Sequence, residues 1–319
     1  MRLERVASTI IKPHEAGLTI LEFLCRRFTY HTREEWKGKI RFQYVLLNQR
    51  ACQPEEHLAR GDSLQYRMGD IPEPAVDTAF SVIHEDRDLL VIHKPGNLPC
   101  HPGGRYFNHT LWAQLKARFD LPHLSFVNRL DRETSGIVLL AKNPQAARHC
   151  QEQFQSGRVF KRYEVLVEGL FAMEKGHARG VLMRDSASAV RKKMRFHPRA
   201  PSMAGTDPGK PCCTFFRRIR SGRGLSLLAA FPETGRTHQI RATLLAMGYP
   251  VVGDKIYGVD ERLYLRFIQG KMDPRDHARL RLKRQALHAG ELHVEHPETG
   301  RVMKFLSPLP KDMQNLIGE

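Results

Sequence analysis

With 319 residues, of which 41% are hydrophobic, the chain is too long for one small module and can bury a substantial core. A formal net charge of +17 favours a polyanionic partner, because clustered lysine and arginine side chains release counterions when they bind phosphates. No stretch approaches the roughly 18 apolar residues of a membrane-spanning helix, and the charged N-terminus lacks the features of a signal peptide, so we expect a cytoplasmic protein that does not enter a membrane.

The first predicted elements form a small N-terminal domain. Residues 16–28 place apolar side chains on one helical stripe, and residues 44–68 have the composition of short strands separated by turn residues. These elements predict a compact αβ domain at residues 14–69. Two prolines and three acidic residues then predict a linker at residues 70–78.

A second domain begins near Ala79. Its strands and helices do not alternate strictly as βαβ units, so we expect an α+β fold rather than a doubly wound sheet. Residues 172–211 are rich in Gly, Pro, Ser, Lys and Arg and predict long loops around short strands. The apolar patterns predict strands at 88–96, 136–143, 161–169 and 225–232, and helices at 110–119, 144–156 and 237–248.

Polar stretches interrupt the apolar elements of this domain at residues 93–111, in the motif NRLDRETSG and at residues 233–241. In the motif, Asp131 has two interpretations: a turn or capping residue, which is the commoner case, or a carboxylate held for chemistry. A buried catalytic aspartate needs a positive partner to remain ionised. Arg236 and Arg241, near the start of a predicted helix, are suited to bind a carboxylate or a phosphate.

The histidines and cysteines do not predict a metal site. His101, His109 and His238 lack the spacing of a ligand motif, and the six cysteines are scattered without a CxxC pair. The adjacent Cys212 and Cys213 are expected to be packing residues in a strand. The scattered thiols also argue against a disulfide framework.

Four motifs in a fixed order make the chain resemble the RluA family of RNA pseudouridine synthases. The segment VNRLDRETSGIVLLAKN is similar to the family's HRLDxxTSG motif; DLLVIHKPGNLPCHP precedes it, and KRYEVLVEG and ETGRTHQIRATLLAMGYPVVGDKIYG follow it. The resemblance covers residues 79–309 and implies a catalytic domain with a mixed, largely antiparallel sheet flanked by helices and loops. Residues 14–69 are similar, in a loose version, to the S4-type RNA-binding module.

The resemblance implies that the protein isomerises uridine in RNA to pseudouridine, a reaction that needs neither a cofactor nor a metal. Asp131 corresponds to the catalytic aspartate, which either attacks the ribose or the base or assists a glycal route; the sequence leaves this choice open. Tyr163 corresponds to the tyrosine that stacks near the target base and is a candidate for removing the C5 proton. Arg241 corresponds to the arginine that pairs with the aspartate.

Further positions imply contacts with the substrate RNA. Arg129 corresponds to an arginine that fills the gap left by the flipped base, and Ile240 to an apolar residue beside that base. Arg236 and His238 lie in the ETGRTHQIR motif and are predicted to bind substrate. The sequence departs from the family at Asn128, where histidine is usual. Asparagine forms hydrogen bonds but does not titrate near neutral pH, so we expect activity to survive and the loop packing or the RNA contact to change.

The sequence leaves open which RNA is the target and whether the protein is an enzyme or a non-catalytic binding protein. The target is tRNA or large-subunit ribosomal RNA; the segment HPGGRYFNHTL is similar to family members that act on tRNA anticodon stem-loops. The alternative function is a non-catalytic RNA-binding or ribosome-assembly factor on the same fold, but the joint presence of Asp131, Tyr163 and Arg241 favours an enzyme. No helix-turn-helix or basic-zipper pattern indicates a DNA-binding regulator. We expect a monomer whose partner is RNA.

Overall fold

The chain forms two compact units. The first comprises residues 1–76 and 101–120, and the second comprises residues 77–100 and 121–319. The segment 101–120 therefore groups with the N-terminal residues, although it lies within the 79–309 span expected for the catalytic domain. The computed structural model describes residues 6–28, 31–67, 73–119, 123–198 and 209–318.

The first unit contains a four-stranded antiparallel sheet with the order β1-β4-β2-β3. Helices α1 and α2 share one apolar core with this sheet, in which Trp36 is fully buried. Each helix begins with a capping box, Thr19 with Glu22 and Thr32 with Glu35, in which each side chain binds the other residue's backbone N–H. The elements are β1 (Val6–Ile10), η1 (Pro13–Glu15), α1 (Ile20–Arg27), α2 (Arg33–Arg41), β2 (Val45–Leu47), β3 (Arg50–Ala51), β4 (Ser63–Arg67) and α3 (Leu111–Arg118).

The second unit is built on an 11-stranded sheet whose main path is β11-β10-β12-β13-β9-β14-β8-β6-β5. Strands β14 and β8 pair in parallel, and the other described pairs are antiparallel, so the α+β prediction and the mixed, largely antiparallel sheet are confirmed. Its strands are β5 (Ser81–Glu85), β6 (Leu89–Lys94), β7 (Ser125–Phe126), β8 (Ser135–Ala141), β9 (Phe160–Glu168), β10 (Lys175–Arg184), β11 (Met194–His197), β12 (Lys210–Gly222), β13 (Leu225–Pro232), β14 (Leu287–Glu295) and β15 (Val302–Leu306).

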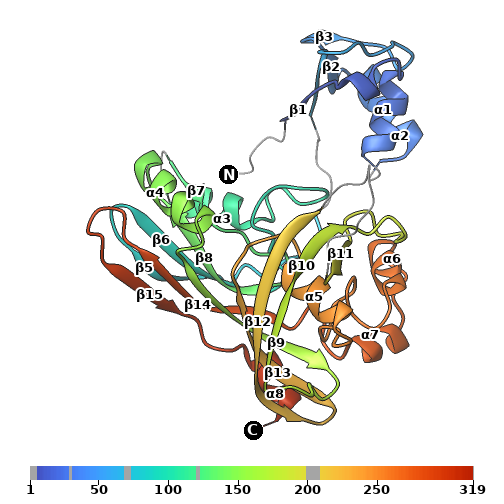
Figure 1. Ribbon diagram of the computed structural model, residues 1–319. Helices are drawn as coiled ribbons and strands as arrows, with labels where there is room; N and C mark the ends of the chain where they lie inside the picture. Colours follow the sequence, from blue (N-terminus) through green and yellow to red (C-terminus); the bar gives the residue numbers. More distant parts are fainter. Residues whose placement is uncertain (1–5, 29–30, 68–72, 120–122, 199–208, 319) are drawn as a thin grey trace. The chain divides into compact units, whose positions relative to one another are not determined.

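The helices of this unit gather at different parts of the sheet (Figure 1). Helix α4 lies against β7, β8 and β14, while α5 lies against β11 and β13, and α8 against β13. Within the described ranges, no helix has the length and apolar character needed to cross a membrane. The helices are α4 (Pro144–Gln155), α5 (Gln239–Ala246), α6 (Arg262–Ile268), α7 (Pro274–Leu280) and α8 (Lys311–Ile317).

The prediction of long loops around short strands at residues 172–211 is wrong for residues 175–184, which form the ten-residue strand β10. This strand pairs antiparallel with β12, and the short strand β11 extends the sheet at its edge. The first half of β10 alternates exposed and buried residues, with the small Gly176, Ala178 and Gly180 between the exposed polar ones. Because these residues lack large apolar side chains, the two-residue period of the strand gave only a weak signal. Residues 199–208 of the predicted loop lie outside the described part of the chain.

Gly136 is the second residue of β8, directly after the loop that carries Asp131. It pairs with Ala289 of β14 and has a φ of 116°, a conformation that L side chains rarely adopt. A Cβ atom at this position would lie 2.2 Å from the carbonyl oxygen of Ala289. Glycine is therefore required both by the backbone conformation and by the close approach of the two strands.

We expect Gly136→Ala to lower the free energy of unfolding by roughly 3 kcal/mol or more, because it adds backbone strain to a steric overlap. Gly38→Ala is the control: Gly38 lies within α2 with nothing within 4 Å of an added Cβ. That control should be neutral or stabilise the protein by up to about 1 kcal/mol. Urea unfolding measures both, and equal effects of the two substitutions would contradict the assignment.

Candidate active site

Asp131 lies in the loop between β7 and β8. Its backbone carbonyl accepts a hydrogen bond of 3.1 Å from Thr134, so the residue does occupy a turn. Its side chain, however, points to charged partners beyond that turn and is 33% exposed. The neighbouring Arg132 pairs instead with Glu133, at 2.7 Å. The turn interpretation therefore holds for the backbone of Asp131, while its side chain forms an ion pair outside the turn.

Arg241 of α5 forms a chain of ion pairs through Asp131 and Asp254. Its Nη1 donates to Oδ2 of Asp131 at 2.8 Å, while Nε and Nη2 donate to the two carboxylate oxygens of Asp254 at 2.6 and 2.8 Å. Asp254 is fully buried and also accepts the backbone N–H groups of Ile256 and Tyr257, each at 2.9 Å. The bidentate pair with Asp254 fixes the guanidinium plane and thereby aims the third nitrogen at Asp131.

The two carboxylates keep Arg241 in place electrostatically, and Arg241 in turn keeps Asp131 ionised. Burial by itself would raise the pKa of Asp131, but the positive charge of Arg241 outweighs it and holds that pKa at about 2. Gln285 adds a weak contact, with its Nε2 3.4 Å from Oδ2 of Asp131. The carboxylate is thus a permanent anion across the physiological pH range.

His238 precedes α5 in a left-handed conformation, with φ 59° and ψ 16°. Its Nδ1 lies 2.9 Å from the hydroxyl of Tyr257, and the same hydroxyl oxygen accepts the backbone N–H of Met194 at 2.7 Å. The tyrosine proton is therefore available to Nδ1, which places the imidazole proton on Nε2, facing Oδ1 of Asp131 at 3.7 Å. Burial, together with the charge of Arg241, lowers the pKa of His238 to about 4, so the ring is neutral at pH 7.

Tyr163 of β9 is half-buried against the main core of the second unit. Burial and the negative charge of Asp131 raise the pKa of its phenol to about 12. Tyr163 thus senses the charge of Asp131, although it lies 32 residues further along the chain. The phenol stays protonated at neutral pH.

Lys94, at the end of β6, binds the backbone of the loop that carries Asp131. It is fully buried, and its ammonium group donates to the carbonyl oxygens of Pro95, Leu98 and Arg132 at 2.8, 2.9 and 3.2 Å. The last of these carbonyls belongs to the residue directly after Asp131. Burial lowers the pKa of Lys94 to about 8, and the three carbonyl groups take the place of its hydration shell.

Asn128 fixes the other end of the loop to β8. Its Oδ1 accepts the N–H of Leu139 at 2.7 Å, and its Nδ2 donates to the carbonyl of Ile137 at 3.3 Å. The side-chain amide thus continues the backbone pairing that Val127 makes with Leu139. This placement favours the loop-packing role that the sequence left open over a direct contact with RNA.

The remaining predicted substrate-binding residues are more dispersed. Arg129 is exposed, whereas Ile240 is 6% exposed and part of the main core. Arg236 is exposed and donates from Nε to the carbonyl of Pro211 at 3.2 Å. A pocket lies beside Asp131, and its lining comprises Asp131, Arg132, Glu133, Lys192, His238, Arg241, Lys255, Ile256, Tyr264 and Gln285.

Sequence reasoning missed the residues that support this site from distant segments. Two of these residues could have been found from the sequence, because each is a charged residue in an apolar segment. Asp254 lies between apolar residues in VVGDKIYG, and Lys94 follows the apolar run LLVIH. Gln285, whose amide also donates to Thr134, carries no such signal because its surroundings in the sequence are polar. A buried charge in an apolar segment requires a partner, but the sequence does not say which residue that partner is.

The lowered pKa of His238 predicts acid sensitivity. The unfolded chain binds this proton near pH 6.5 and the folded chain only near pH 4, so the stability contribution is present above pH 6.5 and is lost as the pH falls between these values. We expect the wild type to lose up to about 3 kcal/mol more than His238→Asn over this interval. Asparagine tolerates the left-handed backbone. Urea unfolding at several pH values measures the difference. If the free energy of unfolding of the two proteins changed equally with pH, the lowered pKa of His238 would be disproved.

Comparisons with known proteins identify the family of the chain. Residues 88–246 match the family model described as RNA pseudouridylate synthase. The chain is 30% identical to ribosomal large subunit pseudouridine synthase D of Haemophilus influenzae over 97% of this chain and 93% of that protein. It is 31% identical to the protein of the same name from Buchnera aphidicola, over 92% of each chain.

A solved structure extends the likeness to the fold. The human RNA pseudouridylate synthase domain containing 1 is 27% identical, with a TM-score of 0.56 over 74% of this chain and 86% of that one. The chain therefore belongs to the RNA pseudouridylate synthase family and is an RNA pseudouridine synthase, an isomerase that acts on uridine in RNA.

Proposed function

We propose that the protein isomerises uridine in large-subunit ribosomal RNA, with Asp131 as its catalytic carboxylate. The observation that carries the catalytic assignment is the ion pair of 2.8 Å between Asp131 and Arg241, in which the carboxylate is ionised but remains partly exposed. The choice of ribosomal RNA over tRNA rests on the names of the relatives, which are ribosomal large subunit synthases. Four cationic side chains, Arg132, Lys192, Arg241 and Lys255, line the pocket against two carboxylates, and this excess supports an anionic substrate.

In this proposal the two oxygens of Asp131 have different tasks. Oδ2 accepts the hydrogen bonds of Arg241 and Gln285, which hold the carboxylate in one orientation. Oδ1 is 3.7 Å from His238, beyond hydrogen-bonding distance, and is the oxygen free to approach the ribose or the base of a flipped uridine. Arg241 acts through Asp131 and does not need to touch the substrate.

Tyr163 and Arg129 contact the RNA in this proposal. A phenol whose pKa is raised to about 12 is rarely ionised at pH 7, which favours stacking on the base over direct removal of the C5 proton. Arg129 is exposed on the same loop as Asp131 and fills the gap that the flipped uridine leaves in the RNA. Ile240 supports the base from the core, while Arg236 and His238 complete the substrate-binding surface.

We further propose that residues 14–69 are an S4-like RNA-binding module, connected by residues 70–78 to a catalytic domain at residues 79–309. The four-stranded sheet and two capped helices of the first unit are compatible with such a module. The monomeric state, the cytoplasmic location and the absence of a cofactor requirement stay predictions of the sequence.

We expect Asp131→Asn to lower the rate of pseudouridine formation at least about a thousandfold while leaving RNA affinity nearly unchanged. Arg241 keeps its pair with Asp254, so the variant should fold. The control is Asp260→Asn, which alters a carboxylate paired with Arg262 outside the pocket and should retain activity. Single-turnover assays on ribosomal RNA fragments measure the rate, and activity in Asp131→Asn would refute the role of the carboxylate.

Pseudouridine mapping in a deletion strain locates the modified site. If every pseudouridine of the large-subunit ribosomal RNA were still present in that strain, the proposed target would be refuted.

Asn128 is proposed to position Asp131 through β8. Asn128→Ala would leave the N–H of Leu139 without its acceptor and should lower both stability, by about 1–3 kcal/mol, and kcat. In Asn128→His, only a neutral ring nitrogen accepts that N–H, so kcat should fall as the pH drops below the pKa of the new imidazole. The wild type should show no such decline between pH 8 and about 6. Identical pH profiles of kcat would contradict this positioning role.

A further inference from the structure

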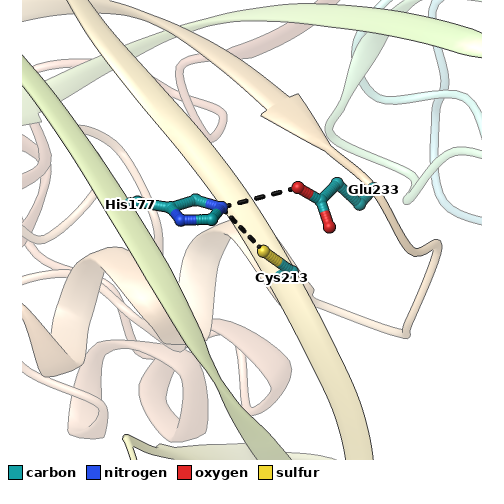
Figure 2. Close-up of side chains that lie close together, drawn as sticks. All are labelled: His177, Cys213 and Glu233. Atoms are coloured by element: carbon teal, nitrogen blue, oxygen red, sulfur yellow. Dashed lines mark hydrogen bonds and ion pairs between the residues drawn. The ribbon is translucent and has the colours of Figure 1, made fainter.

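Three potential metal ligands meet on the large sheet, away from the residues that line the Asp131 pocket. They are His177 of β10, Cys213 of β12 and Glu233, which directly follows β13 (Figure 2). Nε2 of His177 lies 3.0 Å from Sγ of Cys213 and 3.4 Å from Oε1 of Glu233. All three ligand atoms lie within 4.8 Å of one another.

Protons alone cannot give Nε2 of His177 a full hydrogen bond to both of its neighbours, although Cys213 and Glu233 also interact with each other. Nε2 of His177 faces two partners, as the dashed lines of Figure 2 show. A neutral imidazole nitrogen either carries one hydrogen or accepts one, and an ionised Glu233 has none to donate. At most one of the two contacts of Nε2 is therefore a full hydrogen bond, whereas a cation between the three atoms would engage all of them.

The backbone of Cys213 and Glu233 is already fixed for such a site. The carbonyl of Cys213 accepts the N–H of Glu233 at 3.1 Å and the side-chain amide of Gln239 at 2.9 Å, and its own N–H donates to Thr234 at 3.4 Å. His177 is two residues before Arg179, the residue paired in register with Cys213, so both ligands project from the same face of neighbouring strands.

Two of the three distances between ligand atoms are close to those around a tetrahedral zinc ion, and the third is within 4.8 Å. Zinc bonds of about 2.3 Å to sulfur and about 2.0–2.1 Å to nitrogen or oxygen give tetrahedral edges of about 3.5 Å between S and N and about 3.3 Å between N and O. The observed N···O distance of 3.4 Å is already suitable, and the S···N distance of 3.0 Å needs to open by about half an ångström. Such a shift is available to His177 and Glu233, whose side chains are 48% and 57% exposed.

We propose that His177, Cys213 and Glu233 form a zinc site with three protein ligands and a water molecule in the fourth position. Imidazole, thiolate and carboxylate form a donor set that zinc accepts. On binding, the zinc–sulfur bond replaces the S–H bond of Cys213 and the proton is released to solvent. The two anionic ligands then balance the charge of the ion. Exposed Arg179 lies beside Cys213 and opposes a cation there, which limits the affinity.

The metal would stabilise the segment that precedes α5, the helix that carries Arg241. Glu233 begins the motif ETGRTHQIR, and Gln239, in the first turn of α5, bonds both the carbonyl of Cys213 and the hydroxyl of Thr214. Arg241 follows two residues later. The proposed zinc site would therefore position the Asp131 pocket and would not take part in the reaction. No short sequence motif indicates it, because 36 residues separate His177 from Cys213 and 20 separate Cys213 from Glu233.

Titration of the full, tag-free protein with Co²⁺ tests this inference without RNA. We expect one equivalent to produce a sulfur-to-cobalt charge-transfer band and tetrahedral d–d bands, both abolished by Zn²⁺. Cys213→Ser should remove the charge-transfer band. His177→Ala and Glu233→Gln, at exposed positions that the fold tolerates, should each weaken binding at least tenfold. Zn²⁺ should also raise the melting temperature of the wild type, and this shift should vanish in Cys213→Ser.

Cys212→Ala is the matched control, because the adjacent thiol is buried in the main core on the opposite face of β12. It should leave the cobalt spectrum unchanged. Absence of the charge-transfer band in the wild type, or its persistence in Cys213→Ser, would overturn the proposal. Since these measurements do not depend on catalysis, they fail or succeed independently of the assignment of Asp131 and of the RNA target.

Discussion

The buried contact between Arg241 and Asp254 is the interaction on which the rest of the site depends. Both side chains are nearly or fully buried, and removing one partner of such a pair typically costs about 3–5 kcal/mol because the other charge is left uncompensated. The same guanidinium uses its remaining nitrogen to hold Asp131, the only partly exposed member of the chain of ion pairs. A structural requirement of the core thereby orients and ionises a group at the surface of the pocket.

The loop that carries Asp131 is constrained from several directions. Lys94 binds its backbone from within the core, Asn128 attaches its beginning to β8, and Arg241 holds the carboxylate from α5. Each contact is of a different kind: a buried ammonium group bound to carbonyl groups, a side-chain amide hydrogen-bonded to the backbone of β8, and an ion pair. The reaction that we propose for Asp131 demands accurate placement of one carboxylate, and such distributed support supplies it without a long regular element at the residue itself.

The large sheet explains how segments distant in the sequence reach one site. Its central strands carry Tyr163 and the loop of Asp131, and α5 packs against its β11 and β13 strands. The zinc site that we propose uses the same sheet further out, where β10 and β12 bring His177 beside Cys213. In this region the ten-residue strand β10 stands where the sequence predicts loops around short strands. The error follows from its small residues, which pack well between strands but give little hydrophobic periodicity.

The sequence by itself determined the α+β class, strands β6, β8, β9 and β13 and helices α4 and α5 of the second unit, and the family, because apolar periodicity and ordered motifs are local properties. It also indicated that Asp131 would need an arginine, since a buried carboxylate must be compensated. Only the tertiary structure decided how these groups are arranged: that Arg241 is itself held by Asp254, that Asn128 pairs with β8, and that Lys94 supports the loop. These partners lie 11 to 38 residues apart, and their contacts follow from strand order and register, which no local pattern encodes.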